Sequence, residues 1–153
     1  DILPMCHVID FRGRLEVDRP TVPPAELFLL KAQIVEMNEK DWQDMCILLR
    51  EHPVEDSDKD AINLKQVSKI LADDWGFYYT VSTNLKKLRE YVEERPGLSS
   101  DDRANIEAKI NTISDAIEKE PKTLKWKIRA RVGTSRKWYN VVEEVARDTL
   151  SEG

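Results

Sequence analysis

The segment that decides the fold is VSTNLKKLREYVEERPGLSSDDRANIEAKINTISDAI, residues 81–117. Branched aliphatic residues recur at intervals of four, three and four on each side of the turn sequence RPGL: Val81, Leu85, Leu88 and Val92, then Ile106, Ile110, Ile113 and Ile117. This spacing places each set on one face of a helix. Two such faces joined by a Pro-Gly turn predict an antiparallel helical hairpin. Ser99, with Asp102 three residues later, predicts the N-cap of the second helix.

The N-terminal region has the pattern of a β-hairpin. Residues 2–9 and 14–17 are apolar or alternating, and they flank the turn-like sequence DFRG. This arrangement predicts two strands joined at that turn. The proline-rich sequence 19–24 cannot continue a strand, and its last proline, Pro24, suits the first turn of a helix. We expect that helix to run from Pro24 to Met37.

A second helix is predicted to begin after Asn38, which is a typical N-cap residue, and to end before the next proline. The charged sequence EDSDKD at 55–60 indicates a solvated loop. We interpret it as the boundary between two domains, residues 1–53 and 61–150. Apolar spacing over 62–71 predicts one more short helix. The predicted fold class is therefore α+β, with a small N-terminal β-hairpin followed by a mainly α-helical region.

The C-terminal region is basic. Residues 121–142 contain no acid and seven lysines or arginines, interleaved with two tryptophans and a tyrosine. Basic and apolar residues alternate over 125–132, which favours a strand. A helix that starts after Thr123 and ends at Gly133 fits the same residues, and both alternatives stay open. We expect the tail, 143–153, to be a frayed helical end.

Composition limits the class of protein. The chain has 24 basic and 29 acidic residues and a net charge of −5. This balance disfavours a chain-wide nucleic-acid-binding surface but allows a local basic patch. Cys6 and Cys46 lie in apolar contexts without partner spacing, so we expect free thiols in a reducing compartment. No apolar run approaches the ~18 residues of a membrane span, and no signal peptide is visible, so we expect a cytoplasmic protein.

The candidate catalytic residues are Lys31, Asp41 and Asp44. Asp41 and Asp44 share one face of the second predicted helix, and the turn at Asn38 is expected to fold them back toward Lys31. An ammonium beside two carboxylates suits nucleotidyl or phosphoryl transfer, which depends on positioning and on neutralising phosphate charge. Two structural alternatives stay open. The three residues form a salt bridge that ties two helices together, or Asp41 serves as a capping residue.

The sequences LFLLK at 27–31 and NEKDWQD at 38–44 resemble a motif of the nucleotidyltransferase-like superfamily, in particular its abortive-infection toxin type. The resemblance implies that Lys31 contacts the phosphates of an NTP and that Asp41 and Asp44 position them. It also implies a Mg²⁺-dependent transfer of a nucleotide to a hydroxyl acceptor, and an antitoxin or another protein as partner.

The family also carries an Asp-x-Asp pair on a strand after a Gly-Ser turn. This sequence has no Gly-Ser turn, and no Asp-x-Asp pair falls on a predicted strand. We therefore expect residues 1–53 to be the C-terminal part of a nucleotidyltransferase-like core. The residues that make most of the contacts with Mg²⁺ and NTP would then lie upstream. On this interpretation the chain is inactive by itself.

The alternative is a non-enzymatic helical module. Residues 63–95 resemble a winged-helix unit, in which short polar side chains such as Thr80 and Asn84 would contact base edges. Acidic residues in and after its turn argue against DNA there. The basic residues of 122–139 suit a polynucleotide or an acidic protein partner, or they neutralise neighbouring acidic helices. We expect no nucleic-acid binding.

Overall fold

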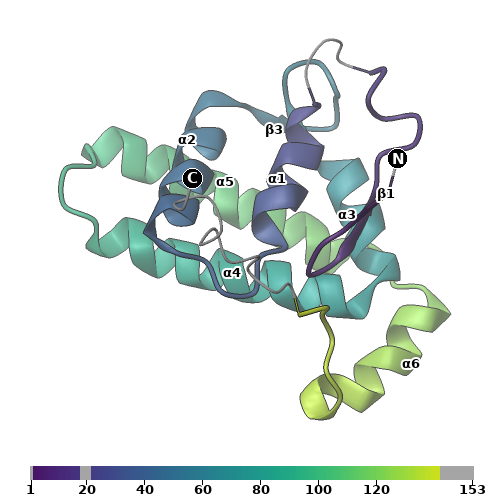
Figure 1. Ribbon diagram of the computed structural model, residues 1–153. Coiled ribbons are helices and arrows are strands. Elements are labelled where there is room, and N and C mark those ends of the chain that lie inside the picture. The colour runs from purple at the N-terminus through teal and green to yellow at the C-terminus, as the bar shows by residue number, and fades with distance from the viewer. Residues whose placement is uncertain (1, 18–21, 142–153) are drawn as a thin grey trace, which may run out of the picture.

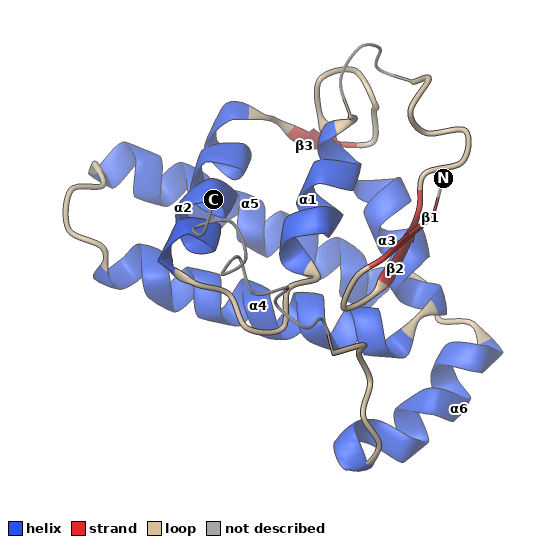
Figure 2. Cartoon of the chain, in the orientation of Figure 1, coloured by secondary structure: helices blue, strands red, loops and turns tan. Residues whose placement is uncertain are grey.

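The computed structural model describes residues 2–17 and 22–141 (Figure 1). The elements in chain order are β1 (Ile2–Pro4), β2 (Val8–Asp10), α1 (Pro24–Ala32), α2 (Glu39–Glu51), β3 (Val54–Glu55), β4 (Ile62–Asn63), α3 (Leu64–Asp73), α4 (Trp75–Glu94), α5 (Ser100–Lys119), α6 (Leu124–Val132) and the 3-10 turn η1 (Gly133–Ser135). Figure 2 shows the strands as short pieces beside a body of helices. The predicted α+β class is confirmed.

The helical hairpin is formed by α4 and α5, which lie antiparallel and pack along their length (Figure 1). All eight aliphatic residues that predicted it are buried. Ser99 Oγ accepts a hydrogen bond from the Asp102 amide at 3.1 Å, as the cap prediction requires. Gly97, in the turn, has a φ of +92°, a conformation that favours glycine. The hairpin is the scaffold on which the other helices pack.

One hydrophobic core joins the N-terminal and C-terminal halves of the chain. It contains β2, α1, α2, α3 and both helices of the hairpin, with Phe28, Leu49, Leu71 and Phe77 among its fully buried side chains. Helix α1 contacts α2, α3 and α4, and α2 also contacts α5. The division into domains at 55–60 stays a prediction. No helix in the described part of the chain is both long and apolar enough to span a bilayer.

The N-terminal β-hairpin exists, but its predicted turn was wrong. β1 pairs antiparallel with β2, with Leu3 opposite Ile9, so the bend lies at residues 5–7. Residues 14–17 form turns instead of a second strand. The reason is local, because the Asp10 carboxylate accepts hydrogen bonds from the amide and guanidinium of Arg12 and the backbone then turns back on itself.

Helix α1 ends at Ala32, five residues before the predicted end at Met37. The buried Asn84 amide of α4 donates hydrogen bonds to the carbonyls of Ala32 at 2.9 Å and Ile34 at 2.8 Å. These carbonyls lie at and just after the end of α1, where a helix needs outside partners. Asn84 therefore stabilises the end of α1 at this point and lets the chain turn toward α2.

The remaining elements follow the predictions with small shifts. Residues 62 and 63 form β4, parallel to β3, and α3 begins only after the Asn63 cap. The undecided segment 125–132 is helical in α6, with Thr123 as N-cap and Gly133, at a φ of +60°, as C-cap. The predicted helical tail at 143–153 lies outside the described residues.

The packing of the hairpin predicts that substitutions at two adjacent positions of α4 change the free energy of unfolding by very different amounts. Leu88 is fully buried against α5, so Leu88→Ala is expected to reduce the free energy of unfolding by about 2–5 kcal/mol. The neighbouring Lys87 is exposed, and Lys87→Ala is expected to cost less than about 0.5 kcal/mol. Urea denaturation of both variants measures the difference. Equal costs would show that the buried face of α4 is assigned to the wrong residues.

Candidate functional site

The structure brings the three predicted site residues together. Lys31 lies in the last turn of α1, and its Nζ is 2.8 Å from Asp44 Oδ2 and 3.2 Å from Asp41 Oδ1. Both aspartates lie near the start of α2 and face back toward α1 because the chain reverses between the two helices. The predicted proximity of the three side chains is confirmed, and their catalytic role stays a prediction. The same contact is the helix-to-helix salt bridge that was its structural alternative.

Asp41 has two structural contacts. Its carboxylate accepts a hydrogen bond from the Asn38 amide at 3.0 Å, and its own amide donates to Asn38 Oδ1 at 3.0 Å. This reciprocal pair is a capping box at the start of α2. The other Asp41 oxygen, Oδ1, faces Lys31. Asp41 is therefore held rigidly, and it in turn orients the lysine.

The charges of the cluster reinforce one another. The hydrogen bond from Lys31 lowers the pKa of Asp44, and the same hydrogen bond raises the pKa of Lys31. Lys31 therefore keeps its proton at neutral pH. About a third of each of these two side chains is exposed, so the ion pair is in reach of solvent.

An open groove of about 370 Å³ begins beside the cluster, between the outer faces of α1 and α2. Its walls are mostly aliphatic. Its lining residues are Leu27, Leu30, Lys31, Asp44, Ile47, Leu48, Glu51 and His52. The groove presents a long apolar surface with charged groups along it.

The cluster does not fit a magnesium site. Across residues 2–17 and 22–141, no group of three or more His, Cys, Asp or Glu side chains gathers in a way that would hold a metal ion. Asp41 and Asp44 both face the Lys31 ammonium, which occupies the position that a cation would take. What these three residues can do directly is contact an anionic group through the lysine.

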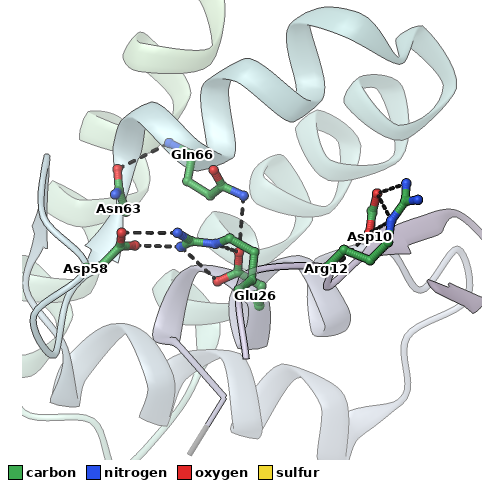
Figure 3. Close-up of polar contacts among 7 residues, drawn as sticks. Asp10, Arg12, Glu26, Asp58, Asn63 and Gln66 are labelled. Atoms are coloured by element: carbon green, nitrogen blue, oxygen red, sulfur yellow. Dashed lines mark hydrogen bonds and ion pairs between the residues drawn. The ribbon is translucent and has the colours of Figure 1, made fainter. Parts of the chain in front are cut away.

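A second charged cluster was missed by the sequence analysis (Figure 3). Arg14 bridges Glu26 at 2.5 Å and Asp58 at 2.5 Å, and Gln66 donates to Glu26 at 3.2 Å. Glu26 is fully buried, and these contacts supply the partners that a buried carboxylate requires. The cluster ties the N-terminal turns to α1, to the 55–60 loop and to α3. No sequence spacing indicated it, because the residues come from four separate segments.

A further cavity of about 470 Å³ lies between the β-hairpin, the start of α4, α6 and the segment 136–140. Near it, the buried His7 ring stacks on Phe77 with ring centres 4.9 Å apart. Its Nε2 is 2.7 Å from Thr80 Oγ1, which also accepts a hydrogen bond from Trp138 Nε1 at 3.2 Å. Burial lowers the pKa of His7 to about 4, against a partly opposing effect of Asp74.

Gly76 permits the close approach of segment 136–140 to α4. A β-carbon at this position would lie 2.5 Å from the Trp138 carbonyl oxygen, which is too close for any side chain. On the other side of the segment, the Asn140 amide donates to the Cys6 carbonyl at 2.9 Å. The segment therefore joins the β-hairpin to α4.

Two of the polar residues proposed to read base edges face inward. Thr80 and Asn84 are buried, and both make the internal hydrogen bonds described above.

The cations of the basic region divide into two groups. Lys122 donates to the carbonyls at the end of α5, and Lys125 pairs with Asp73 at 2.9 Å, so these neutralise neighbouring groups. Others, on the outer face of α6, are exposed.

Comparison with known proteins adds no relative. No protein-family model matches the chain, and neither a curated protein nor a solved structure matches it.

Buried His7 predicts a pH-dependent stability. Because its pKa falls from the usual 6.5 to about 4 on folding, the unfolded chain binds a proton between these values that the folded chain does not. The free energy of unfolding should fall as pH drops from about 6.5 toward about 4, with a slope of up to about 1.4 kcal/mol per pH unit, and this contribution should be constant above that window.

The test is urea denaturation across this pH range for the unaltered chain and for His7→Gln, which keeps a polar group near Thr80. The variant is expected to have a shallower pH dependence. Identical slopes would contradict the assignment of a buried, neutral His7.

Proposed function

We propose that this chain belongs to a nucleotidyltransferase-like protein, which transfers a nucleotide from an NTP to a hydroxyl acceptor. Its role would be to hold the NTP phosphates through Lys31, oriented by Asp41 and Asp44. The observation that supports this proposal is the convergence of the motif's lysine and two aspartates at 2.8 and 3.2 Å. The catalytic carboxylates of the intact protein would lie outside this chain.

The two aspartates would have different tasks. Asp41 is held by the capping box and is largely covered, so it keeps Lys31 aimed in one direction. Asp44 has no comparable second contact among the described residues, and it is more exposed than Asp41. An incoming phosphate would therefore replace Asp44 as the partner of Lys31 while Asp41 stays in place. A charge-assisted hydrogen bond to phosphate is among the stronger polar contacts that a lysine makes.

An antitoxin or another protein partner belongs to the same proposal, because the resemblance is to the abortive-infection toxin type. The competing proposal is a non-enzymatic helical module that binds its partner through α6. A specific observation favours keeping it, since α6 contains no buried residue in spite of its apolar side chains.

Nucleotide binding tests the role of Lys31. We expect the chain to bind an NTP in the presence of Mg²⁺, and Lys31→Met to weaken that binding by about tenfold to a hundredfold through the loss of a charge-assisted hydrogen bond. Titration with a fluorescent NTP analogue measures both affinities.

Lys40→Met is the matched control, because Lys40 is an exposed lysine close to the cluster at the start of α2. It removes the same charge and is expected to change the affinity by less than about twofold. Equal losses in the two variants would contradict the proposal, because Lys31 would then contribute no more than any nearby positive charge.

A further inference from the structure

The outer face of α6 carries an apolar stripe that the rest of the described chain leaves exposed. Leu124 is 73% exposed, Ile128 57% and Val132 37%. At about 100° per residue these side chains occupy one arc of about 80° around the helix. Figure 1 shows α6 at the edge of the helical body, where it packs on α3 and α4 through one face only. A branched aliphatic stripe of this kind is typical of a surface that a partner covers.

Cations flank this stripe on both sides. On the same helical wheel, Lys127 and Arg131 lie along one edge, and Lys125, which pairs with Asp73 at 2.9 Å, lies along the other. The Trp126 side chain of α6 points the other way, toward α4, where its ring lies against the Tyr78 ring with ring centres 5.1 Å apart. The exposed face therefore combines aliphatic and positively charged groups without an aromatic ring. The absence of an aromatic side chain from that face disfavours base stacking, which uses aromatic side chains.

The groove between α1 and α2 has the complementary character. Ile47, at 53% exposure, lies among the half-buried Leu27, Leu30 and Leu48. The charged side chains that line it are Lys31, Asp44 and Glu51, so two carboxylates face one ammonium and the net charge of the lining is negative. An aliphatic helix with basic edges therefore matches this groove in both polarity and charge.

The spacing of the groove residues also suits a helix. On α2 the lining positions 44, 47, 48 and 51 follow one helical face, and on α1 the positions 27, 30 and 31 do the same. Two adjacent helix faces of this kind form a furrow into which a third helix packs with anchors one turn apart. The three aliphatic residues of α6 are spaced at i, i+4 and i+8, as such anchors are.

Within one chain α6 cannot serve as that third helix, because it packs on α3 and α4 through its other face. We propose that the chain self-associates, with the apolar stripe of α6 from one copy docked in the α1/α2 groove of a second copy. This contact joins two different surfaces, so each copy has one docking helix and one groove. The inference does not rest on the nucleotidyltransferase proposal, although Lys31 and Asp44 of the proposed phosphate site also line the groove.

Two variants separate the halves of the contact. Ile128→Asp places a carboxylate in the stripe of α6, and Ile47→Asp places one in the groove. Both positions are more than half exposed, so the fold of a single copy should tolerate them. Sedimentation velocity over a series of concentrations should show self-association of the unaltered chain, weakened at least about tenfold by each variant.

Leu15→Asp is the matched control, because Leu15 is an exposed aliphatic residue in the N-terminal turns that belongs neither to the α6 stripe nor to the lining of the groove. It should self-associate like the unaltered chain. Circular dichroism of all variants confirms that each is folded.

Mixing gives the sharpest result. The Ile47→Asp variant keeps an intact α6 and the Ile128→Asp variant keeps an intact groove, so an equimolar mixture should form mixed pairs that neither variant forms alone. Fluorescent labelling of one variant makes these pairs visible in sedimentation. The proposal is overturned by an unaltered chain that is monomeric at all concentrations, by association that neither variant weakens, or by a mixture that fails to pair.

Discussion

The two hydrogen bonds from the buried Asn84 amide to the carbonyls of Ala32 and Ile34 determine where α1 ends, and the candidate site depends on that end. Without a partner, these carbonyls would be desolvated at a cost of about 1–3 kcal/mol each. With it, the helix stops one residue after Lys31, and the chain reverses toward Asn38. The lysine at the end of α1 and the aspartates at the start of α2 then meet. Asn84 itself is held by the long α4, so the scaffold hairpin sets the geometry of the site.

The N-terminal segment is attached to the same region by polar contacts. The buried Gln33, next to the end of α1, accepts a hydrogen bond from the His7 amide at 3.1 Å. The His7 ring reaches Thr80, one helical turn before Asn84 on α4. Arg14 adds the buried bridge to Glu26 at the start of α1. Both ends of α1 are therefore held by polar partners from outside the helix, and its apolar face fills the core between them.

Sequence reasoning succeeded where the determining contacts are local or periodic. The spacing of aliphatic residues in 81–117 predicted the helical hairpin, and Asn38 with its neighbours predicted the start of α2, because a cap is made by residues three positions apart. It failed where the contact is distant. Asn84 lies 52 residues from Ala32, so nothing within α1 indicates that it ends early. The Arg14 bridge to Asp58 spans 44 residues and left no pattern.

The period of α6 was undecided for a different reason, since eight alternating residues fit a helix and a strand equally well. Its exposed apolar stripe is also a property of the tertiary structure, because only the packing of Trp126 shows which face remains outside. For the site, the motif around Lys31 predicted the contact with Asp41 and Asp44, while the apolar groove beside it required the arrangement of two helices in space.

The pKa of Asp44 is the measurement that tests this account most directly. The Lys31 hydrogen bond lowers it in the folded chain, and the account holds that Asn84 is what brings Lys31 into place. In an NMR titration of the side-chain carboxyl carbons, the Asp44 pKa should lie below its usual value in the unaltered chain and return toward that value in a folded Asn84→Ala variant. An Asp44 pKa that stays equally low in the variant would contradict the dependence of the site on the Asn84 hydrogen bonds.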